Sequence, residues 1–167
     1  MRSFHIKRYC SLILLACTLL TLQSCSFKKV DAPEILSELI TKCESVPAHF
    51  LYSSDTYENS LDEENSYLLF RDKNFPSYCE SYAVALGEND ALWEIHVFVA
   101  RSLGDAGFIE NALYKRLHLL QNRDIYIYDT QTYEEHVSSG KVVRNGKIVC
   151  LALCDNNLKI AKEIKRL

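Results

Sequence analysis

A carboxylate and an imidazole stand two residues apart at Glu94 and His96, within a run of β-forming residues. Side chains at positions i and i+2 of a strand point to the same face, so the two groups could act together. They could supply two zinc ligands, or a general base and the group that orients it, which makes a metal-assisted hydrolase one hypothesis. No His-Glu-x-x-His or paired Cys-x-x-Cys motif supplies further ligands, so a solvated or helix-covered sheet face explains the pair better.

Other catalytic signatures are missing from the sequence. It contains no Gly-x-Ser-x-Gly nucleophile elbow and no glycine-rich phosphate loop, and its five glycines are scattered. Beyond Glu94 and His96, we predict no catalytic residue, no metal ligand and no cofactor. The sequence therefore favours a non-catalytic protein over an enzyme.

Four cysteines follow position 25, and the sequence leaves their redox state open; they are Cys43, Cys79, Cys150 and Cys154. An oxidising compartment would permit disulfides, but their connectivity cannot be read from sequence. Cys150 and Cys154 are not expected to pair, because four residues of extended strand separate them by roughly 13 Å. Both are interpreted as small buried residues. A thiol redox role for either is the alternative, and it requires an exposed thiol of low pKa.

Tyrosine is the one notable excess, with ten in the chain. Amphipathic aromatic side chains are enriched at binding surfaces. Several of these tyrosines are better explained as half-buried strand residues. Tyr126, Tyr128 and Tyr133 fall outside the regular pattern, and we predict that these three form a binding surface.

The first 24 residues have the organisation of an export segment. Three basic residues lie among the first eight, and the apolar run 11–22 is shorter than the roughly 20 residues that span a bilayer. The run Leu22-Gln23-Ser24-Cys25 then resembles the lipobox of bacterial lipoproteins, in which the cysteine thiol receives a diacylglycerol and becomes the new N-terminus. We predict a signal peptide at 1–24, a lipidated Cys25, and a tether at 25–31. An ordinary cleaved signal peptide with an incidental cysteine is the alternative.

Removal of this segment leaves 143 residues, a length typical of one domain, which we place at 32–167. Three of the 19 basic residues and none of the 22 acidic ones are removed, so the formal net charge becomes −6. This mildly acidic charge argues against nucleic acid or anionic lipid as the main partner. Two acyl chains hold a protein stably, so the expected location is the extracytoplasmic face of the cell membrane, reached through the lipid on Cys25.

The domain is expected to begin with an amphipathic helix from about Asp31 to Glu44, followed by an irregular stretch at 51–79. The clearest part of the core lies at 80–167, where two hairpins alternate with two helices. Their expected ranges are 80–86 and 91–100 for the first hairpin, 105–122 for its helix, 142–154 for the second hairpin, and a last helix capped by Asn156 or Asn157. The Asn145-Gly146 pair predicts a type I′ turn.

These two tandem ββα units, preceded by the N-terminal helix, predict an α+β fold with a four-stranded antiparallel sheet. Their helices are expected to cover one face. The other face is left to the N-terminal helix, to residues 51–79, or to a partner.

Several features follow the lipobox and the N-terminal helix in a fixed order. They are a strand Glu94-Ile95-His96-Val97-Phe98-Val99, a helix with Arg116 and Gln121, a tyrosine at 126 or 128, and a hairpin over 141–153. This combination resembles a family of exported lipoproteins of Gram-positive (Firmicutes or clostridial type) bacteria that carry a C-terminal domain of unknown function. The resemblance covers about half of the chain and departs from the family in the acidic loop 53–66 and the extra cysteines. It implies a location and a fold, but no reaction and no ligand.

The first functional hypothesis is thus a non-catalytic envelope module that binds a protein or a wall glycan. An envelope enzyme, either the metal-assisted hydrolase or the thiol redox protein, is the alternative. The lipobox alone does not decide the Gram type of the host.

Overall fold

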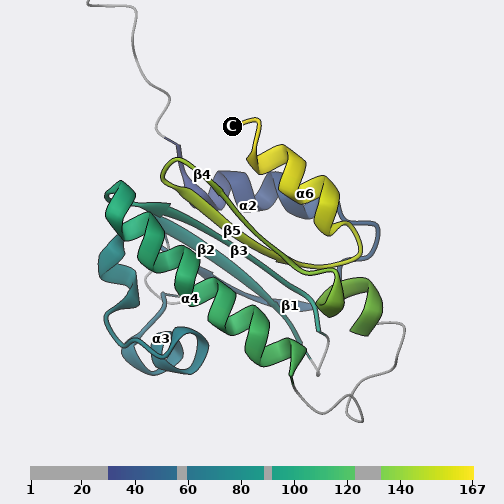
Figure 1. Ribbon diagram of the computed structural model, residues 1–167, viewed down its shortest axis with the longest axis horizontal. Coiled ribbons are helices and arrows are strands. Elements are labelled where there is room, and N and C mark those ends of the chain that lie inside the picture. Colours follow the sequence, from purple (N-terminus) through teal and green to yellow (C-terminus); the bar gives the residue numbers. More distant parts are fainter. Residues whose placement is uncertain (1–29, 56–59, 89–91, 123–132) are drawn as a thin grey trace, which may run out of the picture.

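The computed structural model describes residues 30–55, 60–88, 92–122 and 133–167, with the side chains of 133–135 left out. Within them it shows one antiparallel sheet with helices on both faces (Figure 1). The predicted α+β class and antiparallel sheet are therefore confirmed. Cys25, Tyr126 and Tyr128 lie outside the described residues.

The sheet has five strands in the order β1-β2-β3-β5-β4, and every neighbouring pair is antiparallel. Their bounds are β1 (His49–Ser53), β2 (Cys79–Gly87), β3 (Glu94–Ala100), β4 (Lys141–Asn145) and β5 (Ile148–Leu153). The prediction of four strands was wrong, because β1 adds an edge strand to β2. It was missed because an edge strand needs little apolar cover: Phe50 and Leu51 are exposed, which removes the alternation that marks a half-buried strand.

The second hairpin forms where it was predicted, but its turn differs from the prediction. Asn145 pairs with Ile148, so the two loop residues are Gly146 and Lys147. Gly146 has a φ of 58°, and neither of its neighbours has a positive φ. Glycine at the first loop position fits a type II′ turn rather than type I′.

Six helical segments accompany the sheet in the described ranges. They are α2 (Ala32–Ile40), α3 (Glu63–Phe70), the 3₁₀ turn η1 (Phe75–Tyr78), α4 (Leu103–Gln121), the π-helical turn η3 (Tyr133–Ser138) and α6 (Asn157–Ile164). Helix α2 ends four residues earlier than predicted.

Helix α3 contradicts the prediction of an irregular stretch at 51–79. The Asp62 side chain caps it by accepting a hydrogen bond from the Asn65 N–H at 2.7 Å, and Arg71 ends it in the left-handed conformation with a φ of 60°. The helix buries only Ser66 and Phe70, so it has no apolar stripe for a periodicity argument to detect.

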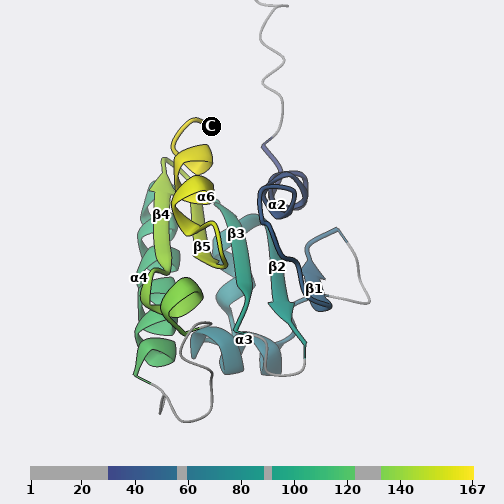
Figure 2. The same cartoon turned by 90° about the vertical axis from the view of Figure 1, so that its right-hand side faces the viewer.

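The helices divide between the two faces of the sheet (Figure 2). Helices α3 and α4 with η1 cover one face, and α2 and α6 cover the other. The expectation that α4 and α6 share a face was therefore wrong. The reason is visible in β3 and β5, where every residue is buried, so both faces of these strands need apolar cover.

Among the described residues, no helix is long and apolar enough to cross a membrane.

Candidate functional site

Strand β3 places Glu94 and His96 together on the face beneath α4, as their spacing predicted. The Arg116 side chain descends from α4, and its Nε donates to Glu94 Oε2 at 2.7 Å while its Nη2 donates to Glu94 Oε1. His96 Nε2 lies 2.9 Å from the same Oε2, without the alignment of a hydrogen bond. The Glu94 residue is 8% exposed and His96 is 0% exposed. A buried carboxylate is thus held between a guanidinium and an imidazole.

The charges of this cluster are set by burial and by the three groups themselves. Burial alone would raise the pKa of Glu94, but the Arg116 charge and the contact with His96 outweigh it and lower that pKa to about 2. Burial lowers the pKa of His96, and the neighbouring Glu94 only partly opposes this. At neutral pH the carboxylate is therefore ionised and paired with Arg116, while the imidazole is neutral.

This arrangement is better suited to fixing α4 on the sheet than to catalysis. The His96 ring is sealed in by Phe70, edge-on at 5.8 Å, and by Phe98 at 6.3 Å between ring centroids. Within the described part of the chain, Glu94 and His96 join no group of three His, Cys, Asp or Glu side chains that could hold a metal ion. A buried pair without access to substrate matches the helix-covered sheet face considered from the sequence.

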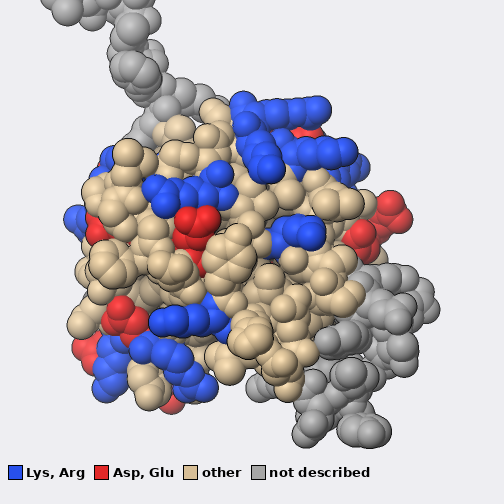
Figure 3. Space-filling model, in the orientation of Figure 1, with Lys and Arg blue, Asp and Glu red and all other residues tan. Residues whose placement is uncertain are grey.

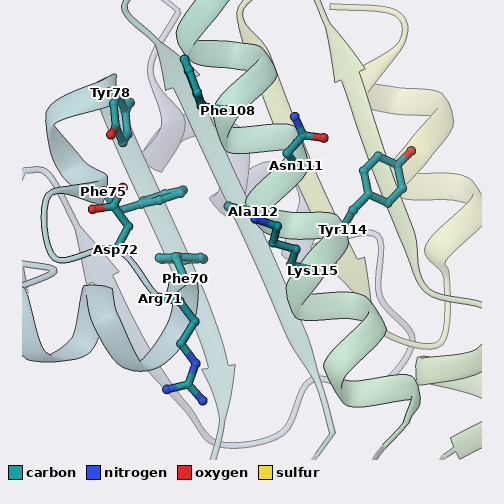
Figure 4. A pocket seen from close by; sticks show the side chains of 10 residues that line it. All are labelled: Phe70, Arg71, Asp72, Phe75, Tyr78, Phe108, Asn111, Ala112, Tyr114 and Lys115. Carbon is teal, nitrogen blue, oxygen red and sulfur yellow. The ribbon is translucent and has the colours of Figure 1, made fainter.

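A groove between the α3–η1 segment and α4 is the better candidate site (Figure 4). It encloses about 590 Å³, within the range of small-molecule sites. Figure 3 shows the face that carries α4, which is mostly uncharged, with Lys and Arg side chains gathered at the upper right and mixed basic and acidic groups at the lower left. The groove is lined by Phe70, Arg71, Asp72, Phe75, Tyr78, Phe108, Asn111, Ala112, Tyr114 and Lys115.

Aromatic rings form the apolar part of this groove. Phe70 and Phe75 stack with ring centroids 4.0 Å apart, and Tyr78 stacks on Phe108 at 5.8 Å with an interplanar angle of 20°. Phe108 is 66% exposed. The residues that α4 buries are Ala106, Ile109, Leu113, Leu117 and Leu120. Phe108 lies beside that stripe and presents its ring to solvent at the groove.

Polar groups surround these rings. The Asp72 charge and a hydrogen bond to Asp72 raise the pKa of the Tyr78 hydroxyl, which donates its one hydrogen to Asp72 and keeps its lone pairs as acceptors. Arg71 has a left-handed backbone conformation, and its guanidinium lies over the Tyr67 ring, 5.6 Å from the ring centroid. Asn111 and Lys115 add an amide and a cation from α4. None of the ten lining residues is a histidine, cysteine or serine, and the groove combines aromatic stacking faces with carboxylate, amide, hydroxyl and cationic groups.

The structure does not test the predicted tyrosine surface, because none of its three side chains is described. Tyr133 begins η3, its side chain is outside the described part, and the other two members lie outside the described residues. Two other tyrosines, Tyr78 and Tyr114, line the groove. Nothing in the local pattern indicates that these two residues, 36 positions apart, belong to one surface.

The described cysteines are unbonded, and they fall into two kinds. Cys79 and Cys150 are buried core residues; burial raises the pKa of Cys79 to about 12 and also raises that of Cys150, which removes reactive thiolate. Cys43 and Cys154 instead meet beside Asp155, with one potential ligand atom from each within 4.8 Å of the others. Among the described residues, this is the only such group of three that could hold a metal ion.

No protein-family model, curated protein or solved structure matches this chain. The resemblance to Gram-positive lipoproteins therefore stays a prediction from the residues that suggested it.

Proposed function

We propose that this chain is a membrane-anchored extracytoplasmic lipoprotein of the cell envelope, and that its domain is a non-catalytic module that binds wall glycan in the groove between α3 and α4. The lipobox ending at Cys25 supports the anchor. The observation that carries the binding role is the stacking of the half-buried Tyr78 on the exposed Phe108 in the lining of the groove.

A sugar fits the chemistry of this groove. The apolar face of a pyranose packs on aromatic rings, and its hydroxyls need donors and acceptors at the ring edge, which Asp72 and Asn111 supply. Lys115 and Arg71 can pair with the carboxylates or phosphates that wall polymers carry. Binding is favoured when a ligand covers an exposed ring such as Phe108, because burial of apolar surface lowers the free energy of the complex.

Replacement of Phe108 by alanine tests this site. We expect the affinity for soluble wall-glycan fragments, measured by titration calorimetry, to fall about tenfold or more, which corresponds to about 1.4 kcal/mol. Because the ring is largely exposed, the substitution should change the free energy of unfolding by only about 0.5 kcal/mol.

Leu119→Ala is the matched control, since Leu119 is 55% exposed on the same helix and does not line the groove. It should leave glycan affinity unchanged. Equal affinities for wild type and Phe108→Ala would remove the groove from the proposal. Failure of the wild-type protein to bind any wall fragment would reject glycan and favour an envelope protein as the partner.

Replacement of Cys25 by serine tests the anchor. We expect loss of incorporated fatty acid label, loss of the protein from the membrane fraction, and accumulation of the unprocessed chain, because serine offers no thiol to the lipid transferase. Cys17→Ser, a cysteine substitution within the same N-terminal segment, should leave labelling intact. An ordinary signal peptide predicts a different result. The wild-type protein would carry no fatty acid label, and the Cys25→Ser protein would be cleaved and released normally.

A further inference from the structure

Two cysteines from opposite ends of the described domain meet on the face of the sheet away from the groove. Cys43 follows α2, and Cys154 directly follows β5. Their sulfur atoms lie within 4.8 Å of each other. Cys43 is half-buried and reachable from solvent, whereas Cys154 is fully buried.

Hydrogen bonds hold both backbone segments in place around the sulfurs. Asp155 Oδ2 accepts from the backbone N–H groups of Glu44 at 3.0 Å and Ser45 at 2.7 Å. The Asn156 side chain donates to the Lys42 carbonyl at 3.1 Å. The residues that make these contacts lie one or two positions from Cys43 or from Cys154. The short distance between the two thiols is therefore fixed by the fold.

The two thiols differ in reactivity. Contact with Cys154 lowers the pKa of Cys43, helped by the Trp93 indole and the Lys159 charge, and these effects outweigh burial and the Asp155 carboxylate. The contact with Cys43, together with burial, raises the pKa of Cys154. Trp93 Nε1 is buried and has no hydrogen-bond partner among the described residues, so a Cys43 thiolate would give it an acceptor. The accessible sulfur is thus also the one more easily ionised, as expected of an attacking thiol.

We propose that Cys43 and Cys154 form a reversible intramolecular disulfide, with Cys43 as the thiol that reacts first with an external disulfide. The Cys43 thiolate attacks one sulfur of a low-molecular-weight or protein disulfide and forms a mixed disulfide, releasing one thiolate. Cys154 loses its proton and attacks the Cys43 sulfur, releasing the second thiolate. The two cysteines lose two electrons and two protons, and the external disulfide is reduced to two thiols.

A metal site built from the same residues is the competing arrangement. Structural zinc is held by four protein ligands, whereas the described part of the chain supplies three here. One oxygen of Asp155 is already engaged by two backbone N–H groups. The other oxygen, Oδ1, is buried without a hydrogen-bond partner among the described residues and is the one that a metal would take. A disulfide needs no fourth ligand, so the three-residue set favours it over structural zinc.

The test uses the full chain, purified in detergent and equilibrated with glutathione and its disulfide. Intact mass and alkylation mapping should show the oxidised protein lighter by two hydrogens, with Cys43 and Cys154 protected. Cys79 and Cys150 serve as internal controls and should react with the alkylating reagent only after denaturation, in both states. The closed loop exceeds 100 residues, so oxidation should raise the unfolding temperature on the order of 10 °C.

Two single variants assign the roles of the sulfurs. Cys154→Ser should trap one glutathione on Cys43, and Cys43→Ser should trap almost none on Cys154; neither should show the rise in unfolding temperature. Free alkylation of both cysteines after equilibration with glutathione disulfide would overturn the proposal. So would stoichiometric zinc that protects both thiols from oxidation in wild type and is lost in Asp155→Asn, a variant that keeps an oxygen for the Glu44 and Ser45 amides.

Discussion

Replacement of Arg116 by methionine is expected to lower the free energy of unfolding by about 3–5 kcal/mol at pH 7. The substitution leaves the Glu94 carboxylate buried beneath α4 without the guanidinium that neutralises it. An unpaired buried charge must be desolvated without compensation or take up a proton, and both cost stability. Urea unfolding followed through Trp93, the single tryptophan of the chain and 1% exposed, provides the measurement.

Lys147→Met is the matched control, because it breaks an exposed ion pair. Lys147 Nζ lies 3.0 Å from Glu80 Oε1, with both side chains 44% exposed, so its loss should cost less than about 1 kcal/mol. The double variant Glu94→Leu with Arg116→Met should recover most of the lost stability, since apolar groups can replace a buried ion pair. If Arg116→Met costs no more than the control, the pair does not fasten α4 to the sheet.

Acid is expected to destabilise the domain through the same cluster. An unfolded carboxyl of Glu94 binds its proton near pH 4.5, whereas the folded one does so only near pH 2. Between these values the unfolded state binds more protons, so stability falls as the pH falls. The contribution of Glu94 is complete above about pH 4.5 and is lost on acidification through pH 2, which amounts to on the order of 3 kcal/mol.

His96 acts in the same direction at higher pH. Its pKa in the folded protein is lowered from 6.5, so the unfolded state takes up a proton first as the pH falls below that value. The free energy of unfolding, measured by urea titration at intervals from pH 7 to pH 2, should decrease over both windows. Glu94→Gln should flatten the lower window and His96→Gln the upper one. Slopes identical to those of wild type would show that neither group is linked to folding.

The sequence predicted those parts of the fold whose residues carry strong local patterns. Alternation of apolar and polar side chains located β2 and β3, and the Asn145-Gly146 pair located the second hairpin. Segments without such a pattern were not predicted: β1 exposes Phe50 and Leu51, and α3 is acidic with only two buried positions.

The candidate sites depend on contacts between residues that are far apart in the chain. Glu94 and His96 could be paired from their spacing, but nothing local joins them to Arg116, 22 positions later. Tyr78 and Phe108 come together only because η1 packs beside α4. Cys43 and Cys154 meet only after the sheet has brought the two ends of the domain side by side. A single sequence contains the residue types of each site but not these long-range approaches.

The anchoring of the Glu44–Ser45 segment by Asp155 has a consequence for the order of folding. The hydrogen bond between Glu44 and Asp155 spans 111 positions, whereas β2 with β3 and β4 with β5 are hairpins of neighbouring residues. Local pairings form quickly and distant ones slowly. Helix α2 packs on β2 and β3, so Leu36 and Leu39 can be covered once that hairpin has formed. In a chain that emerges N-terminus first, the Glu44–Ser45 segment is instead fastened only after Asp155 has appeared. The segment after α2 is therefore the last part of the N-terminal region to be fixed, and Cys43 can meet Cys154 only after nearly the whole domain has emerged.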